Sequence, residues 1–148
     1  MYEAIAFDVG TKNIGIALYS KPDIFLPYKT IQFNNDTKLL KIKLAILKKQ
    51  FSKIKCSIIG LSKYEETDNY IKQVFLPIYK KEFANIKYFF IDESNTTQQA
   101  QTLISIQNNL RTLPRRIRKK DKSSGIIDST SALILLYKAY EENIIPCN

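Results

Sequence analysis

Apolar residues along the chain follow two different periods, which predict strands in some segments and helices in others. An alternation of apolar and polar residues, or a short continuous apolar run, indicates a β-strand. Five segments have such a pattern, namely residues 2–7, 14–20, 27–33, 56–61 and 86–91. Only short connections separate the first three segments, so we expect these strands to form an antiparallel meander.

Helical spacing of apolar residues follows the third and the fourth predicted strand. The helix predicted at residues 37–53 has an apolar face that consists of Leu40, Leu44, Leu47 and Phe51. Asp36 or Thr37 is placed to cap this helix, because a side-chain oxygen there can accept from its first free N–H groups. The second helix is indicated by Tyr70, Val74 and Ile78. Pro77 should kink or interrupt it, because proline has no N–H to donate.

Two further helices are predicted in the C-terminal part of the chain. The first would follow a cap at Thr96 or Thr97, and its apolar residues include Ala100, Leu103 and Ile104. The second covers about residues 126–142 and opens with Asp128. Acidic residues are favourable in the first turn of a helix because of the helix dipole.

The resulting order, βββαβαβα, predicts an α/β fold of the ribonuclease-H-like type, a mixed five-stranded sheet with helices on both faces. The later strands need helical crossovers, whereas the first three need only turns. In such a sheet the first strand lies centrally beside the fourth, and ligands bind at the carboxyl ends of the strands. The 148 residues fit a single domain spanning the whole chain.

The excess of basic over acidic residues indicates the kind of partner that the protein binds. Lys and Arg total 23 against 14 Asp and Glu, a formal net charge of +9. Such an excess favours an anionic partner such as nucleic acid or a membrane surface. A composition rich in lysine throughout the chain is the alternative explanation.

Histidine and cysteine usage excludes several kinds of chemistry. The chain has no histidine, which excludes Ser-His-Asp and Cys-His catalysis and zinc held by histidine. Cys56 and Cys147 have no metal-ligand spacing and suggest no disulfide framework, so we expect a reducing, cytoplasmic setting. No apolar run approaches the roughly 20 residues that span a bilayer, so we expect no membrane association.

Carboxylates occur at three places where the predicted fold could bring them together. Asp8 ends the first strand before Gly10, Asp92 and Glu93 directly follow the fifth strand, and Asp128 opens the last helix. Three carboxylates at one edge would repel one another, so we interpret them as ligands of two Mg²⁺ or Mn²⁺ ions. Two such ions catalyse in-line displacement at phosphorus.

Each carboxylate also has a simpler structural interpretation. Asp8 could accept hydrogen bonds from the backbone of its own turn. Asp92 and Glu93 could simply precede the residue that caps the next helix. Asp128 could serve only as a favourable negative charge near the amino-terminal end of its helix dipole. The three acids together are more informative than any one of them.

A strongly basic segment precedes the last helix. It contains seven cationic residues, Arg111, Arg115, Arg116, Arg118, Lys119, Lys120 and Lys122. We interpret residues 111–125 as a mobile loop that binds the phosphate backbone of nucleic acid, together with Lys12 in the first turn. A solvated surface loop is the alternative.

Three blocks of the sequence resemble the YqgF family, a RuvC-like group of Holliday junction resolvases and pre-16S rRNA nucleases. They are Phe7-Asp8-Val9-Gly10-Thr11-Lys12-Asn13-Ile14-Gly15-Ile16-Ala17, Ile91-Asp92-Glu93-Ser94-Asn95-Thr96-Thr97 and Ile127-Asp128-Ser129-Thr130-Ser131-Ala132-Leu133-Ile134-Leu135-Leu136. The resemblance implies a metal-dependent endonuclease with Asp8, Asp128 and one acid of the Asp92-Glu93 pair as catalytic carboxylates. We prefer Glu93 without excluding Asp92, because neighbouring strand residues face opposite ways.

The resemblance leaves several alternatives open. Asn13, Ser62 and Ser94-Asn95 depart from the family pattern at positions expected to contact substrate. A non-catalytic nucleic-acid-binding protein of the same fold is therefore an alternative, and an actin-like ATPase fragment is a weaker one. The sequence does not decide between pre-rRNA and branched DNA as the nucleic acid, or between a monomer and a homodimer.

Overall fold

The computed structural model describes residues 2–92 and 126–147, with side chains from Ser129 onward in the second range. Its elements are, in chain order, β1 (Ala4–Val9), β2 (Asn13–Ser20), β3 (Ile24–Gln32), α1 (Thr37–Gln50), β4 (Cys56–Leu61), α2 (Glu65–Tyr70), η1 (Ile71–Phe75), α3 (Leu76–Glu82), β5 (Lys87–Asp92) and α6 (Ile126–Glu141). The helix predicted after Thr96 or Thr97 and the basic segment at residues 111–122 lie outside the described residues.

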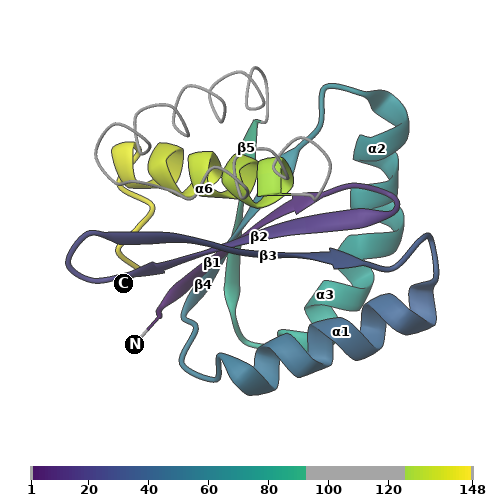
Figure 1. Ribbon diagram of the computed structural model, residues 1–148, viewed down its shortest axis with the longest axis horizontal. Helices are drawn as coiled ribbons and strands as arrows, with labels where there is room; N and C mark the ends of the chain where they lie inside the picture. Colours follow the sequence, from purple (N-terminus) through teal and green to yellow (C-terminus); the bar gives the residue numbers. More distant parts are fainter. Residues whose placement is uncertain (1, 93–125, 148) are drawn as a thin grey trace, which may run out of the picture.

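The five strands form one mixed sheet in the order β3-β2-β1-β4-β5 (Figure 1). β1 pairs with β2 antiparallel and with β4 parallel, and β4 pairs with β5 parallel. The predicted meander and the central first strand are therefore confirmed.

Helices cover both faces of the sheet, as predicted (Figure 1). One apolar cluster joins Ile5, Phe7 and Val9 of β1 to the leucines of α1 and to the buried residues of η1 and α3. The other joins Ala4 and Ala6 of the same strand to α6. Neighbouring residues of β1 thus belong to opposite faces, which is the alternation that fixes where Asp8 lies.

Phe7 lies at the centre of the first cluster. Its ring contacts those of Phe75, Tyr79 and Phe83 at centroid distances of 5.7, 6.0 and 5.8 Å. Burial raises the pKa of the Tyr79 phenol to about 12, so this hydroxyl stays neutral at ordinary pH. This aromatic packing fixes β1 against the helices that cover it.

The third strand begins at Ile24, three residues earlier than predicted. The alternation of residues 27–33 predicts a strand only from Pro27 onward, and proline cannot donate to a sheet ladder. β3 is an edge strand, and its register with β2 shifts between Lys29 and Pro27, which leaves Tyr28 as an extra residue. A bulge at a sheet edge accommodates the proline.

The second helical region differs from the prediction in its start and in its buried face. It begins at Glu65, and its fully buried side chains are Ile71, Phe75 and Tyr79. The predicted row of Tyr70, Val74 and Ile78 is only half-buried. Both rows of residues have helical spacing, so spacing alone could not show which row is fully buried and which is only half-buried. The predicted interruption is present as the π-helical turn η1, directly before Leu76 and Pro77.

Asp36 caps α1, as one of the two alternatives predicted. Its Oδ1 accepts from Lys38 N at 3.0 Å and from Leu39 N at 3.2 Å. The helix ends at Gln50, three residues before the predicted end, and Phe51 forms its C-cap.

Replacing Asp36 with Ala is expected to lower the free energy of unfolding by about 1 kcal/mol, because two amide groups at the start of α1 lose their acceptor. Urea denaturation measures this change. Asp36→Ser is the control, because serine keeps an acceptor at the cap and should restore most of the loss. Equal losses in both variants would show that the cap is not the cause.

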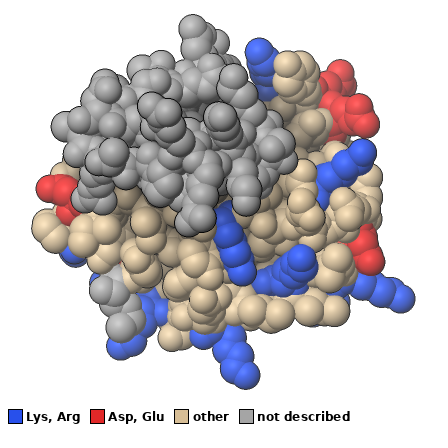
Figure 2. Space-filling model, viewed as in Figure 1, with Lys and Arg blue, Asp and Glu red and all other residues tan. Residues whose placement is uncertain are grey.

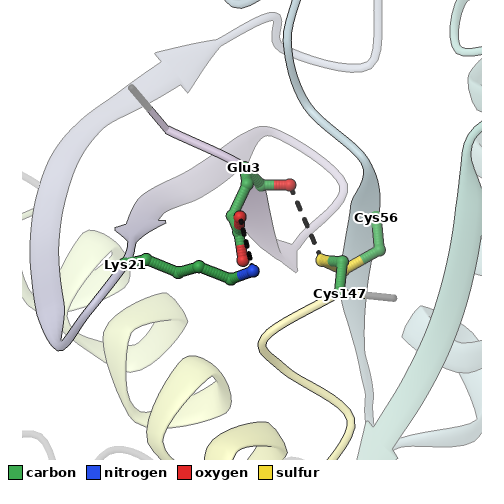
Figure 3. The surroundings of a disulfide bond; sticks show 4 residues. All are labelled: Glu3, Lys21, Cys56 and Cys147. Carbon is green, nitrogen blue, oxygen red and sulfur yellow. Dashed lines mark hydrogen bonds and ion pairs between the residues drawn. A yellow bond between two sulfur atoms is a disulfide. The ribbon is translucent and has the colours of Figure 1, made fainter.

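Cys56 and Cys147 form a disulfide, although the sequence suggested no disulfide framework (Figure 3). Cys56 opens β4, and the tail after α6 returns to it, with Ile145 buried and Ile144 N donating to Ala139 O at 2.9 Å. The two cysteines are 91 residues apart. Their spacing in the sequence gave no sign of this pairing, because the fold alone brings them together.

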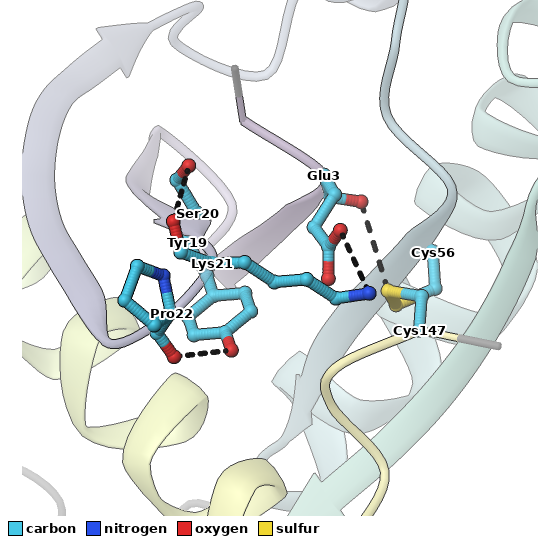
Figure 4. A network of polar contacts seen from close by, with 7 residues as sticks. All are labelled: Glu3, Tyr19, Ser20, Lys21, Pro22, Cys56 and Cys147. Atoms are coloured by element: carbon cyan, nitrogen blue, oxygen red, sulfur yellow. Dashed lines mark hydrogen bonds and ion pairs between the residues drawn. A yellow bond between two sulfur atoms is a disulfide. The ribbon is translucent and has the colours of Figure 1, made fainter.

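Polar groups surround this disulfide at the amino-terminal edge of the sheet (Figure 4). The Glu3 carbonyl oxygen lies 3.6 Å from Cys147 Sγ, and Glu3 Oε2 lies 3.9 Å from Lys21 Nζ. In the adjoining β2–β3 turn, the Tyr19 hydroxyl donates to Pro22 O at 3.1 Å. The helices among the described residues include none that is long and apolar enough to cross a membrane.

Candidate active site

Asp8 is a half-buried residue next to the end of β1. Ala4 and Ala6 pack in the cluster under α6, and Phe7 and Val9 pack on the opposite face. Strand alternation therefore places Asp8 on the α6 side of the sheet, at the carboxyl end of its central strand. This is the position that the sequence predicted for it.

Glycines flank Asp8 on both neighbouring strands. Gly15 of β2 is its direct partner in the antiparallel pair. On the other side, Phe7 pairs with Ile59 of β4, so the next position in that register is Gly60. Ile58 packs under α6, which places Gly60 on the same face as Asp8. Neither neighbour carries a side chain, and glycines inside strands often mark a close approach of a ligand.

The turn that follows Asp8 is held by hydrogen bonds to a second turn. Gly10 N donates to Asn13 O at 2.9 Å, and a Cβ at Gly10 would lie 3.1 Å from that oxygen. Lys12 O accepts from Phe33 N at 2.9 Å and from Asn34 N at 3.1 Å. The turn is thus fixed by the connection between β3 and α1. The Lys12 side chain is exposed, as a phosphate contact requires.

Asp92 ends β5 at the same edge of the sheet. In β5, Phe89 and Ile91 pack on the α6 side, whereas Tyr88 packs on the other. The alternation therefore assigns the exposed Asp92 to the face opposite Asp8. Its carbonyl oxygen accepts from Lys138 Nζ of α6 at 3.1 Å. Glu93, the preferred ligand of the pair, lies outside the described residues.

Asp128 belongs to the first turn of α6, and its backbone is described but its side chain is not. The other end of α6 lies at the amino-terminal edge of the sheet. There the Tyr140 hydroxyl donates to Asp23 Oδ1 at 2.8 Å, and the tail after α6 reaches Cys56. The helix is about 24 Å long. Lys138, in its last turn, also reaches Asp92 O at the carboxyl end of β5, so α6 crosses the sheet obliquely, and Figure 1 draws its first turn on the side where β1 ends.

A complete metal site cannot be assembled from the described residues alone. Among them, no three His, Cys, Asp or Glu side chains are placed to hold a metal ion. Two of the three preferred ligands, the side chains of Glu93 and Asp128, are outside this set, so the three-carboxylate site stays a prediction. The donor set itself consists only of carboxylate oxygens, which are the ligands that Mg²⁺ and Mn²⁺ prefer.

Sequence comparisons identify relatives along nearly the whole chain. A family model described as "RuvX: Holliday junction resolvase" matches residues 2–142. A protein of Mycoplasma capricolum subsp. capricolum, with the curated name "Putative pre-16S rRNA nuclease", is 34% identical over 131 residues. The alignment covers 81% of this chain and 85% of that relative.

Solved structures of two resolvases have the same fold. The RuvC of T. thermophilus, in complex with a Holliday junction substrate, gives a TM-score of 0.61 at 7% identity and covers 96% of this chain and 98% of its own. The Fowlpox virus resolvase, in complex with Holliday junction DNA, gives 0.61 at 14% identity and covers 98% and 99%. These similarities confirm the predicted ribonuclease-H-like fold.

Proposed function

Because the chain belongs to the RuvX family of Holliday junction resolvases, which is the YqgF family of the sequence resemblance, we propose that it is a divalent-metal-dependent endonuclease. Its substrate would be structured or single-stranded nucleic acid, either a precursor of rRNA or branched DNA. The observation that carries the proposal is the position of Asp8. This carboxylate lies half-buried at the carboxyl end of the central strand, between two glycines.

The proposed site consists of Asp8, Glu93 and Asp128. These carboxylates would hold Mg²⁺ or Mn²⁺, which supply an activated water and stabilise the leaving oxygen in hydrolysis of a phosphodiester. The fixed turn after Asp8 holds that carboxylate in place, because its backbone is bonded to the connection between β3 and α1. The two glycine neighbours place no side chain directly beside it on β2 or β4.

Binding of the substrate would use cationic residues around this edge. We propose that Lys12 contacts phosphate, together with the predicted basic segment at residues 111–122. We also propose that all 148 residues form one domain and that the protein works in the cytoplasm. The reducing conditions of that compartment would then favour two free thiols over the disulfide between Cys56 and Cys147.

Cleavage of labelled nucleic acid tests this function. The unmodified protein is incubated with a fluorescently labelled four-way DNA junction and with a labelled structured RNA, in Mg²⁺, in Mn²⁺ and in EDTA. We expect cleavage of at least one substrate in the presence of either metal and none in EDTA. Binding of both substrates without cleavage in either metal would contradict the enzymatic function and favour the non-catalytic alternative.

Glu93→Gln is expected to lower the cleavage rate about a hundredfold or more, whereas Asp92→Asn should leave it within about threefold. The reason is strand alternation, which assigns Asp92 to the face opposite Asp8. The measurement is the single-turnover rate in Mg²⁺, and each substitution removes one negative charge from the same edge. The opposite ranking of the two variants would identify Asp92 as the ligand.

A further inference from the structure

Helix α1 presents a strongly basic outer face on the side of the sheet opposite α6. The segment from residue 36 to residue 55 contains a single acidic residue, the N-cap Asp36. Its seven lysines are Lys38, Lys41, Lys43, Lys48, Lys49, Lys53 and Lys55. In the described parts of the chain none of these lysines forms an ion pair. Figure 2 shows Lys side chains across the lower part of the molecule, where Figure 1 places α1.

Two isoleucines lie exposed within this basic face. Ile42 and Ile46 are each 57% exposed, although α1 buries Leu40, Leu44 and Leu47 in the core. They are one helical turn apart, and Lys38 precedes them by one turn. Lys49 follows Ile46 by three residues, so the four residues form one row along the outer face of the helix.

The order of charges in α1 is not the one that would stabilise the helix by itself. The first turn contains no acidic residue and contains Lys38, although the dipole of a helix favours negative charge there. Lys48 and Lys49 in the last turn have the favourable sign. The positive charge therefore extends over the whole helix, including the first turn, next to which the N-cap Asp36 is the single acidic residue.

A shallow pocket continues this surface toward β3. It has a volume of about 190 Å³ and is lined by Lys29, Thr30, Ile31, Lys43, Ile46 and Leu47. The Lys43 ammonium donates to the Gln32 carbonyl oxygen at 2.8 Å, a neutral partner that leaves its charge uncompensated. The pocket thus adds one further cationic side chain, Lys29, beside Lys43 and the exposed Ile46.

We propose that this outer face of α1 docks the sugar-phosphate backbone of single-stranded RNA, at a surface separate from the candidate active site. Lys38 and Lys49 are about 16 Å apart along the helix, so phosphates of several consecutive nucleotides can lie along the row. The lysines would contact phosphates, and Ile42 and Ile46 would contact the apolar faces of riboses and bases. The inference rests on the proposed function, because it gives the same nucleic acid a second contact.

An anionic membrane surface is a less suitable partner for this helix. A helix that lies in a membrane interface inserts a broad apolar face into the lipid. The apolar face of α1 is already buried in the core, and only the two isoleucines remain outside it. Two side chains in a row of lysines fit a polymer that lies along the helix better than they fit a lipid layer.

Salt-dependent RNA binding tests the docking surface. Binding of a fluorescein-labelled 20-nucleotide RNA is followed by anisotropy in EDTA between 50 and 300 mM KCl, values chosen from the range in which counterion release dominates (about 0.05–0.3 M). In Lys38→Gln/Lys49→Gln, we expect the slope of log K against log salt to become less steep by about 1.4, because two phosphate contacts are lost. Affinity at 0.1 M salt should fall about tenfold.

The control is Lys81→Gln/Lys87→Gln, which removes the same net charge from two exposed lysines of α3 and β5. Equal changes of slope in both double variants would show a diffuse effect of net charge and overturn the docking surface. No change in the α1 variant would overturn it as well. Loss of binding to vesicles of phosphatidylcholine and phosphatidylserine (7:3) with unchanged RNA binding would assign the face to a membrane instead.

A second pair of variants tests the isoleucines. Ile42→Ala/Ile46→Ala should lower RNA affinity with an unchanged salt slope, because alanine removes apolar contact and keeps every charge. Ile24→Ala/Leu26→Ala, two exposed apolar residues near the start of the edge strand β3 and outside the pocket, is the matched control and should bind normally. All these measurements are made without metal. They can therefore fail while cleavage persists, or succeed in a protein that does not cleave.

Discussion

Asp8→Asn is expected to lower the rate of nucleic-acid cleavage about a thousandfold, with little effect on the fold. Asparagine has the shape of aspartate without its charge, so a metal ion would lose one of its anionic ligands. Metal ions contribute several kcal/mol to the stabilisation of the charge that develops in the transition state. A loss of about 4 kcal/mol of transition-state stabilisation corresponds to the expected thousandfold fall in rate. Single-turnover cleavage in saturating Mg²⁺ measures it.

Two controls separate this effect from a general disturbance of the protein. Asp23→Asn removes a carboxylate at the amino-terminal edge, where its Oδ1 accepts from the Tyr140 hydroxyl, an interaction that the amide can keep. This variant should cleave normally. Thermal melting in EDTA should give similar curves for both variants, and added Mn²⁺ should stabilise only the protein with Asp8. Cleavage that survives in Asp8→Asn would end the metal-site proposal.

Cys147→Ser is expected to lower the free energy of unfolding by about 3–4 kcal/mol under oxidising conditions. The bond that it removes joins residues 91 positions apart, and a crosslink over such a distance restricts the unfolded chain strongly. The tail that it fixes also covers part of the α6-side core through Ile145. Denaturation in guanidinium chloride measures the difference.

A reductant provides the matched comparison for this variant. With excess reductant, the free energy of unfolding of the unmodified protein should fall to nearly that of Cys147→Ser. The free energy of unfolding of the variant itself should not change. Thiol counting in the native and denatured states confirms which form is present. Two free thiols in protein purified without reductant, with a stability equal to that of the variant, would contradict the disulfide.

The architecture was predictable because its determinants are local. Short turns between the first three strands require an antiparallel meander, and the apolar run at residues 56–61 requires a strand buried on both faces. Features that depend on distant partners were missed. The bulge that admits Pro27, the choice of Ile71 rather than Tyr70 as a core residue, and the pairing of Cys56 with Cys147 all depend on the assembled sheet and on what packs against it.

The candidate site was predicted in part for the same reason. Asp8 was identified because a charge at the end of an apolar strand is costly unless something binds it. The flanking Gly15 and Gly60 were not recognised as part of the site, although glycine inside a strand is a signal that the sequence carries. Their relation to Asp8 depends on the register of three strands, which becomes known only from the pairing.

In the proposed nuclease, the glycines beside Asp8 would limit how the site can discriminate among nucleic acids. Gly15 and Gly60 themselves offer no side chain there that could read a base or distinguish ribose from deoxyribose. Selectivity must then arise farther out, in turns and helices that hold the polymer before it reaches the carboxylate. Engineering a new preference by mutating Gly15 or Gly60 should give inactive enzymes rather than altered ones, whereas variation of the outer contacts can change the preference and preserve turnover.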